Sequence, residues 1–179
     1  MKDITVNADG CYMPHRKVGG WAGCIHGQDS QGKPRVVELM GSVFNPHSSN
    51  QMEAIAILNT LSALQDPYTI TLYTDSQGIV GSMKSYVNWV SSALEYKPKW
   101  FRGIAEEDRH KFDFLMRYHS VKFFWVKGHS LSLNNRRVDR LAKMSALSFA
   151  NRLDTKGDGV STISPTVREY KKSLEVWQL

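Results

Sequence analysis

The sequence is short of cysteine and has no long apolar run. Its two cysteines, Cys11 and Cys24, show neither CxxC spacing nor a neighbouring histidine cluster, which argues against a structural zinc site. So few thiols are typical of a protein that works in a reducing compartment. No window of about 18 apolar residues occurs, and residues 1–10 alternate like a strand instead of forming a signal peptide. These absences predict a soluble, intracellular protein of the cytoplasm with no membrane partner.

Acidic residues are outnumbered. The chain of 179 residues has 23 Lys and Arg against 17 Asp and Glu, which gives a net charge of +6 and a pI of about 9.3. This balance fits a polyanionic partner such as nucleic acid, although many small proteins are mildly basic without one. Apolar residues make up 41% and charged residues 22%, so one ordinary globular domain can bury its own core without disulfides.

The apolar periodicity predicts a mixed α/β domain. In chain order the predicted elements are strands over 4–10, 21–27 and 35–44, a helix over 47–65, a strand over 68–75, helices over 76–90 and 106–119, a strand over 120–129 and a helix over 135–150. We expect the first three strands to form an antiparallel meander. The stretch 11–20 contains Pro14, Gly19 and Gly20 and is typical of a loop.

The helix over 47–65 has the clearest signals. Ser48 or Ser49 can cap it, and Ser49 with Glu53 roughly matches a capping box. Its apolar stripe consists of Ala54, Ile57, Leu58 and Leu61. Glu53 therefore lies near the start of a helix that buries one face.

Residues 151–179 differ in character from the rest of the chain. They begin polar and end on the apolar residues Val176, Trp177 and Leu179. We expect one domain over 1–150 and a C-terminal extension over 151–179. The extension either docks back on the domain or binds a partner protein.

Four carboxylates fall at the ends or starts of predicted elements. Asp9 and Asp75 end strands, Glu53 opens a helix, and Asp139 follows His129 by ten residues in the last helix. Each acid taken alone has a plain explanation, such as solvent contact, helix capping or a surface charge. If the strands over 4–10 and 68–75 are parallel neighbours, however, Asp9 and Asp75 lie side by side at the edge where α/β sheets bind ligands.

Acids crowded at one sheet edge indicate a divalent metal site. Like charges raise one another's pKa values, and a divalent cation removes that penalty. Hard oxygen ligands suit Mg²⁺ or Mn²⁺, and two such ions can clamp the attacking and leaving oxygens of a phosphodiester. Such chemistry tolerates one nearby histidine for proton transfer.

Six short motifs then occur in a familiar order: "ADG" at 8–10, "GGWAG" at 19–23, "NQME" at 50–53, "YTDSQ" at 73–77, "WVKGHS" at 125–130 and "NNRRVDRLA" at 134–142. With these motifs the chain resembles type 1 ribonuclease H, the family that cuts the RNA strand of RNA/DNA hybrids. The resemblance implies an α/β ribonuclease H-like fold with a five-stranded mixed sheet. Strands 1–3 would be antiparallel, strands 1, 4 and 5 parallel, and helices would cover both faces. It implies a catalytic domain over 1–150, an endonuclease that leaves 5′-phosphate and 3′-hydroxyl ends, and a monomer.

The resemblance also assigns the catalytic residues. Asp9, Glu53, Asp75 and Asp139 would hold two Mg²⁺ ions, for which Mn²⁺ is a substitute, and Asp9 would bridge both. His129 would aid proton transfer and product release from a loop. A degenerate, inactive member would be expected to lack at least one of these residues, and none is missing.

Residues that touch the hybrid follow from the same resemblance. Cys11, Asn50, Gln77 and Asn135 would face the minor groove, where the 2′-hydroxyl distinguishes RNA from DNA. Ser48 and Ser49 would lie at a pocket for a phosphate of the DNA strand, where the family usually has Thr or Asn. Ordinary turn and cap polarity is the alternative for all of these side chains.

The stretch 84–102 lies where many relatives carry a basic protrusion. Tyr86 and Trp89 would offer aromatic surfaces there, and Lys97 and Lys99 would face phosphates, together with Lys84 and Arg102. Packing in the core is the alternative for Trp89 and Trp100. This stretch is less basic than the strongly basic examples, so we expect modest hybrid affinity with strong salt sensitivity.

Two other functions remain open from the sequence. One is a different enzyme on the same fold, such as a transposase, a resolvase or an exonuclease, against which the motifs at 125–130 and 134–142 argue. The other is a non-catalytic nucleic-acid-binding module, such as a subdomain of a reverse transcriptase, against which the complete set of acids argues. Met1 lies close before a strand, which suggests a free-standing protein.

Overall fold

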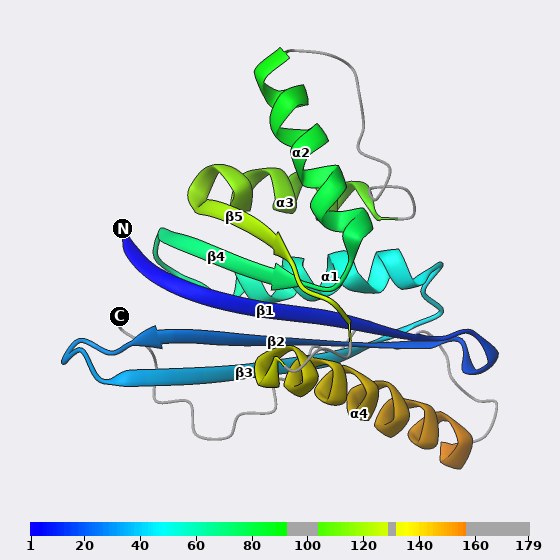
Figure 1. The fold of residues 1–179 in the computed structure, drawn as a ribbon. Helices are drawn as coiled ribbons and strands as arrows, with labels where there is room; N and C mark the ends of the chain where they lie inside the picture. The colour runs from blue at the N-terminus through cyan, green and yellow to red at the C-terminus, as the bar shows by residue number, and fades with distance from the viewer. Residues whose placement is uncertain (93–103, 129–131, 157–179) are drawn as a thin grey trace.

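The computed structural model describes residues 1–92, 104–128 and 132–156 and forms one five-stranded mixed sheet (Figure 1). The strands are β1 (Lys2–Met13), β2 (Val18–Gln28), β3 (Pro34–Phe44), β4 (Tyr68–Thr74) and β5 (Ser120–Trp125), in the spatial order β3-β2-β1-β4-β5. The pairs β1–β2 and β2–β3 are antiparallel, and the pairs β1–β4 and β4–β5 are parallel. The predicted strand arrangement is confirmed.

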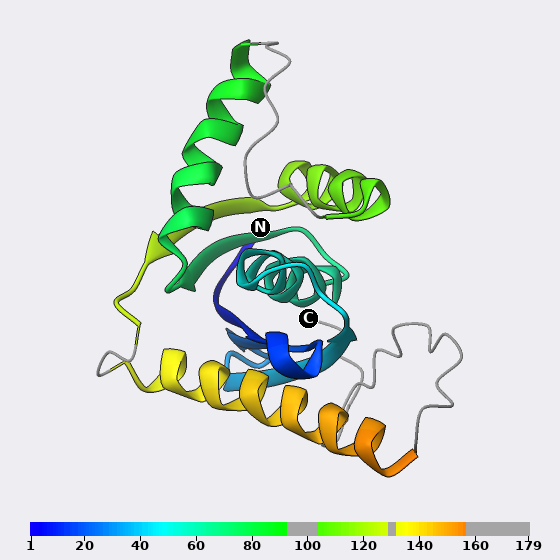
Figure 2. The same cartoon turned by 90° about the vertical axis from the view of Figure 1, so that its right-hand side faces the viewer.

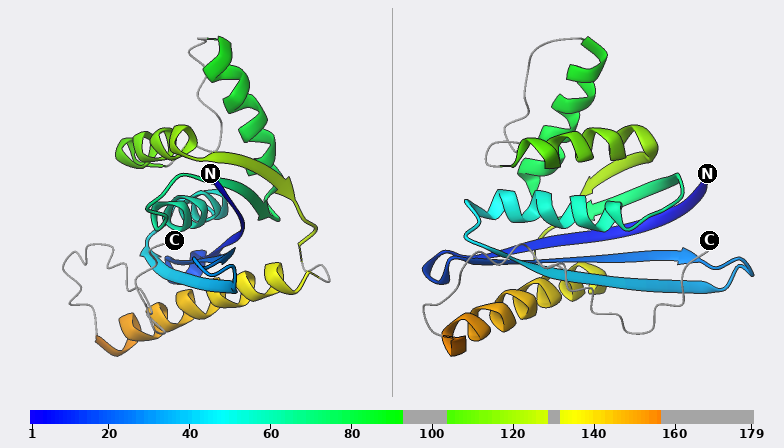
Figure 3. Two further views of the ribbon diagram at one scale, coloured as in Figure 1. Left: turned by 90° about the vertical axis from the view of Figure 1, so that its left-hand side faces the viewer. Right: turned by 180° about the vertical axis from the view of Figure 1, so that it is seen from behind.

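Helices cover both faces of this sheet, as predicted. They are α1 (Ser49–Ser62), α2 (Gln77–Ser92), α3 (Glu106–Tyr118) and α4 (Leu133–Lys156), with a short 3₁₀ turn η1 (Pro14–Arg16) between β1 and β2. Helix α4 packs across β1, β2 and β3 on one face, while α1 packs on β1 and β2 from the other, with α3 beside it (Figures 2 and 3). No helix among the described residues is long and apolar enough to cross a membrane.

The main core lies between the sheet and α1. Its fully buried members include Val6, Met52, Ile57, Leu61, Ile70, Leu72 and Phe112. Alternate residues of β4 are buried, as expected for a strand with one face on the core. Two smaller apolar clusters fill the space under α4, one around Ala22 and Val138 and one around Val18 and Ala146. The sheet is thereby packed between α1 and α4.

The stretch 11–20 is not the loop that its glycines suggested. Strand β1 continues to Met13, β2 begins at Val18, and these two residues pair in the antiparallel register. Gly20 is needed for close packing, because a Cβ there would lie 2.1 Å from the carbonyl oxygen of Ala142 in α4. A Cβ on Gly19 would meet the sulfur of Met52 at 2.3 Å. Both glycines therefore let helices approach β2.

Helix α4 runs to Lys156 and so passes residue 150, where the sequence suggested that the domain ends. Arg16 holds the last turns of this helix by a hydrogen bond to Asn151 of 3.1 Å and an ion pair with Asp154 of 3.2 Å. Leu153 packs against the apolar cluster around Val18. The extension beyond 156 lies outside the described residues.

Candidate active site

Two of the predicted acids reach one edge of the sheet from neighbouring parallel strands. Register pairs Asn7 of β1 with Tyr73 of β4, and two residues further along each chain stand Asp9 and Asp75. Asp9 is still within β1 and is only 5% exposed, whereas Asp75 lies just past the end of β4. The parallel pairing alone therefore brings these carboxylates to the same level.

Helix α1 brings the third acid, Glu53, to the same place. Ser48 caps this helix by accepting a hydrogen bond from the backbone N–H of Gln51 at 3.1 Å. Gly10 allows the helix to lie directly against β1, because a Cβ there would lie 2.5 Å from the backbone nitrogen of Glu53. Since Ser48 is the cap, Ser49 is not the cap of the box roughly expected with Glu53; it is already the first residue of the helix. The side chain of Gln51 accepts from the N–H of His47 at 2.6 Å.

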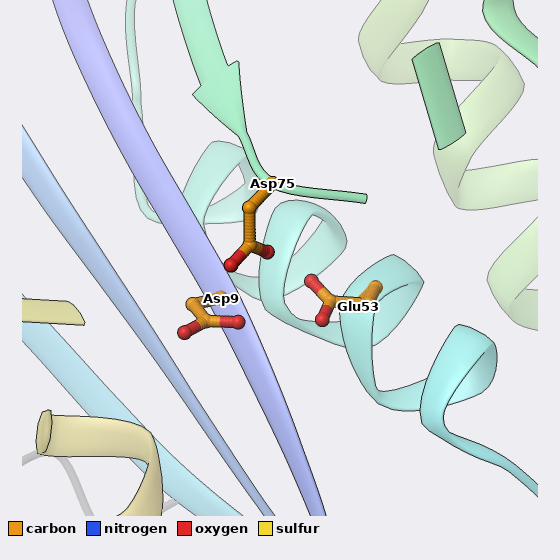
Figure 4. Close-up of side chains that lie close together, drawn as sticks. All are labelled: Asp9, Glu53 and Asp75. Atoms are coloured by element: carbon orange, nitrogen blue, oxygen red, sulfur yellow. The ribbon is translucent and has the colours of Figure 1, made fainter. Parts of the chain in front are cut away.

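The carboxylates of Asp9, Glu53 and Asp75 point toward one another (Figure 4). One oxygen from each residue lies within 4.8 Å of the other two. The acids come from β1, from α1 and from the turn after β4, so the fold, not local sequence, assembles them.

Burial and mutual repulsion disturb the ionisation of this group. Burial, followed by the charges of Asp75 and Asp139, raises the pKa of Asp9 to about 7. Burial, followed by the charges of Asp9 and Asp75, raises the pKa of Glu53 well above its usual range. These carboxyl groups resist losing their protons, and a nearby cation would favour their charged form.

The donor set fits a divalent metal ion. All of its ligand atoms are carboxylate oxygens, which suit Mg²⁺ and Mn²⁺ better than softer metals. One of them, Oε2 of Glu53, is buried without any hydrogen-bond partner. A buried carboxylate oxygen is costly unless something satisfies it, and a cation between the acids would do so.

The fourth predicted acid, Asp139, lies near this group without joining it. It belongs to α4, and its charge is felt by Asp9. Its own carboxylate is engaged by the ammonium of Lys143, one helical turn on, at 2.6 Å and 2.8 Å. Its assignment as a metal ligand stays a prediction.

Comparison with known proteins identifies the family. The model of the RNase H family matches residues 1–147. The chain belongs to the ribonuclease H family. Ribonuclease HI of Campylobacter jejuni is 34% identical over 158 residues, which cover 87% of this chain and 99% of that protein. Ribonuclease H of Nitratidesulfovibrio vulgaris is 34% identical over 149 residues, 80% of this chain and 89% of that protein.

Solved structures agree on the ribonuclease H fold. LC9-RNase H1, a type 1 enzyme with the type 2 active-site motif, superposes with a TM-score of 0.61 at 22% identity and covers 83% of this chain and 74% of that one. LC11-RNase H1, solved in complex with an RNA/DNA hybrid, gives a TM-score of 0.58 at 17% identity over 82% of this chain and 98% of that one. The predicted resemblance to type 1 ribonuclease H is confirmed.

The structure describes several of the residues that this ribonuclease H was expected to use to bind a hybrid. Ser49, Asn50 and Gln77 are exposed around the acids, and Cys11 is half-buried on β1. Ser48 is half-buried and already serves as the helix cap. Asn135 is 1% exposed, and its Oδ1 has no hydrogen-bond partner. Contact of these residues with a hybrid stays a prediction.

Tyr86 is not placed for its expected role as an aromatic surface. It is 4% exposed, its ring packs edge-on against Phe112 at 5.8 Å, and its hydroxyl donates to Asp113. A buried ring with a satisfied hydroxyl is a core residue, which argues against stacking on the hybrid. The other residues predicted for this region lie outside the described residues, as does His129; they are Lys97, Lys99, Arg102 and the side chains of Lys84 and Trp89.

Several residues around the acids were not singled out from the sequence. Trp125 donates from its indole Nε1 to the backbone oxygen of Asp75 at 3.0 Å. A Cβ on Gly128 would lie 3.0 Å from Oδ2 of Asp75. Asn7, two residues before Asp9 on the same face of β1, is buried with its Oδ1 unpaired. Of the residues near the acids, only Lys143 could have been found from the sequence. It lies four residues after Asp139 in a predicted helix, and helix residues four apart face each other.

Proposed function

We propose that this chain is an endonuclease that hydrolyses the RNA strand of RNA/DNA hybrids and depends on divalent metal ions. The observation that carries the proposal is the meeting of Asp9, Glu53 and Asp75, with one oxygen from each within 4.8 Å of the others, in a ribonuclease H fold. RNA/DNA hybrid is the substrate because LC11-RNase H1 binds one and has the same fold. We expect the products to carry 5′-phosphate and 3′-hydroxyl groups.

Asp9 is the central residue of the proposed site. Glu53, Asp75 and Asp139 all act on its ionisation, so Asp9 would hold metal together with each of the other acids. Two Mg²⁺ ions, with Mn²⁺ as a substitute, would supply Lewis acidity to the attacking water and to the leaving oxygen.

The remaining residues act around this centre. Glu53 is held against β1 and would contribute the oxygen that now lacks a partner. Asp75 would bind from the turn after the neighbouring strand β4, and Asp139 would complete the set from α4. His129 would move protons near the leaving group.

One assay tests the proposal. Labelled RNA/DNA hybrid, double-stranded RNA and duplex DNA are incubated with the protein and Mg²⁺, beside Asp75→Asn and the matched control Asp66→Asn, an exposed acid between α1 and β4. We expect cleavage of the RNA strand of the hybrid alone, abolished by Asp75→Asn and unchanged by Asp66→Asn. Undiminished cleavage by Asp75→Asn would overturn the site. Hybrid binding without cleavage would instead support a non-catalytic module.

A further inference from the structure

The end of β5 is fastened to the end of β4 next to the acids. Thr74 pairs with Trp125 across the parallel ladder, and the backbone N–H of Val126 donates to the carbonyl of Thr74 at 3.0 Å. Strand β5 lies at the edge of the sheet beside β4 (Figure 1). The segment that follows β5 therefore leaves the sheet at the level of Asp75.

Asp75 lies between two regular elements and belongs to neither. It follows the last residue of β4 and precedes Gln77, the first residue of α2. Its backbone carbonyl accepts a hydrogen bond of 3.0 Å from the indole Nε1–H of Trp125, a residue fifty positions further along the chain. A side chain of the neighbouring strand thus holds the peptide from which the Asp75 carboxylate projects.

The same segment also approaches the carboxylate of Asp75. A Cβ on Gly128 would lie 3.0 Å from Oδ2, which is tighter than ordinary van der Waals contact. The stretch from Trp125 to Gly128 therefore binds the main chain of Asp75 at one end and lies beside its carboxylate at the other.

Burial alone does not account for Trp125. Its side chain is 44% exposed, as is that of its neighbour Phe124 at 46%, so neither is a core anchor. Phe124 contacts only the ring of Tyr73 among the described aromatic residues, at 5.7 Å, and makes no bond to Asp75. The property that sets Trp125 apart is its N–H donor.

We propose that Trp125 is a positioning residue that orients Asp75 for metal binding. It acts through the Asp75 peptide, as hydrogen-bond partners behind metal ligands do. This inference rests on the proposed function, because it takes Asp75 to be a metal ligand. Without the indole N–H, the peptide of Asp75 can rotate, and the carboxylate loses its fixed aim at Asp9 and Glu53.

The test removes the N–H while it keeps an aromatic ring. Trp125→Phe does so by ordinary substitution, and site-specific replacement of Trp125 by benzothienylalanine, with sulfur in place of the N–H, keeps the full shape of the indole. Phe124→Leu is the matched control, since it removes an exposed ring on the same strand that has no bond to Asp75. Mg²⁺ and Mn²⁺ binding is measured by calorimetry on the substrate-free protein, and hybrid cleavage is measured over a range of Mg²⁺ concentrations.

We expect both Trp125 variants to bind Mn²⁺ about tenfold more weakly, the usual effect of removing a partner behind a metal ligand. The Mg²⁺ concentration for half-maximal cleavage should rise by a similar factor, while the KM for the hybrid stays within about twofold. Phe124→Leu should match the wild-type protein in all three measurements. Wild-type metal affinity in the benzothienylalanine variant would overturn the proposal, as would an equal loss in Phe124→Leu.

Failure of this inference can be told from failure of the proposed function. Asp75→Asn in the same experiments shows whether Asp75 binds metal at all. If Asp75→Asn loses metal and activity while both Trp125 variants keep them, the positioning role is wrong and the active site stands. If Asp75→Asn keeps both, the site itself is wrong.

Discussion

The ammonium of Lys143 bridges both carboxylate oxygens of Asp139, at 2.6 Å and 2.8 Å. The two residues are one turn apart on α4, and Asp139 is the only one of the four predicted acids that lies outside the group formed by Asp9, Glu53 and Asp75. The hydrogen bond between Lys143 and Asp139 raises the pKa of Lys143, so the lysine side chain is a cation at neutral pH. A metal ion that binds Asp139 must therefore share it with Lys143 or displace Lys143 from it.

Replacing Lys143 by Met should strengthen metal binding. The substitution keeps an unbranched side chain, shorter by one atom, and removes a positive charge that competes for Asp139. We expect about fivefold tighter Mn²⁺ binding, equivalent to about 1 kcal/mol of relieved repulsion at a partly exposed site. Calorimetry on the substrate-free protein measures it, with Lys33→Met in the β2–β3 turn as the control. Unchanged or weaker binding by Lys143→Met would show that Lys143 does not compete with metal.

Neutralising Asp9 should stabilise the metal-free protein at alkaline pH. The native state holds a proton on Asp9 up to a pKa of about 7, whereas the unfolded chain releases it near pH 4. The folded protein therefore loses stability as the pH rises from about 4 to 7. Asp9→Asn removes this loss, and we expect the variant to gain up to about 4 kcal/mol over the wild-type protein at pH 8, from about three pKa units at about 1.4 kcal/mol each.

Urea denaturation with a chelator at pH 5 and pH 8 measures this effect. The advantage of Asp9→Asn should be about a third as large at pH 5, because the unfolded chain has then released its proton over only about one of the roughly three pH units that separate the two pKa values. Added Mg²⁺ should reduce the advantage at pH 8, because the cation stabilises the wild-type carboxylates. An advantage that is equal at both pH values would mean that repulsion among the acids is not its cause.

Two glycines should respond to alanine in opposite ways. At Gly10 a Cβ would lie 2.3 Å from the backbone carbon of Met52, so α1 must move away from β1. Gly10→Ala should cost about 2 kcal/mol of stability or more and reduce hybrid cleavage, since Glu53 moves with the helix. At Gly81 in α2 nothing lies within 4 Å, and alanine should add about 0.5–1 kcal/mol without changing cleavage.

Thermal denaturation and hybrid cleavage of the two variants decide this prediction. The Gly81→Ala variant controls for the general effect of an added methyl group. Full activity in Gly10→Ala would show that the position of Glu53 does not depend on the contact between β1 and α1.

The positions of Asp9, Glu53 and Asp75 could be predicted from the sequence because local signals fix each of them. Alternation places Asp9 on one strand and Asp75 at the end of another, although β1 continues past Asp9 to Met13, and a cap with an apolar stripe places Glu53 at a helix start. Parallel pairing then follows from the helix between the strands, since parallel strands need such a crossover. The meeting of the three acids is the consequence.

The features that could not be predicted depend on contacts between distant elements. Gly19 and Gly20 have the sequence signal of a turn, but they serve the approach of Met52 and α4 to a strand. Tyr86 stands in a stretch with basic neighbours, yet packing against α3 buries it. The bond from Trp125 to Asp75 has no local signature, because an exposed indole at a strand end can turn in many directions.

His119 should make the protein less stable in acid. It is 3% exposed between α3 and β5, its Nδ1 accepts from the backbone N–H of Tyr68 at 3.2 Å, and its Nε2 has no hydrogen-bond partner. Burial lowers the pKa of His119. The unfolded chain therefore binds a proton here below about pH 6.5 while the native protein resists it. Stability from this group is complete above that pH and is lost as the pH falls toward the lowered folded pKa.

His119→Asn separates this contribution from that of Asp9, which has the opposite sign in the same range. An Asn oxygen can take the place of Nδ1 and accept from Tyr68 but cannot titrate. The smaller side chain lowers stability at every pH, so the quantity to measure is the slope of the unfolding free energy between pH 7.5 and 5. We expect a shallower acid-side loss in the variant than in the wild-type protein. Parallel slopes in urea denaturation would show that His119 does not resist protonation in the folded state.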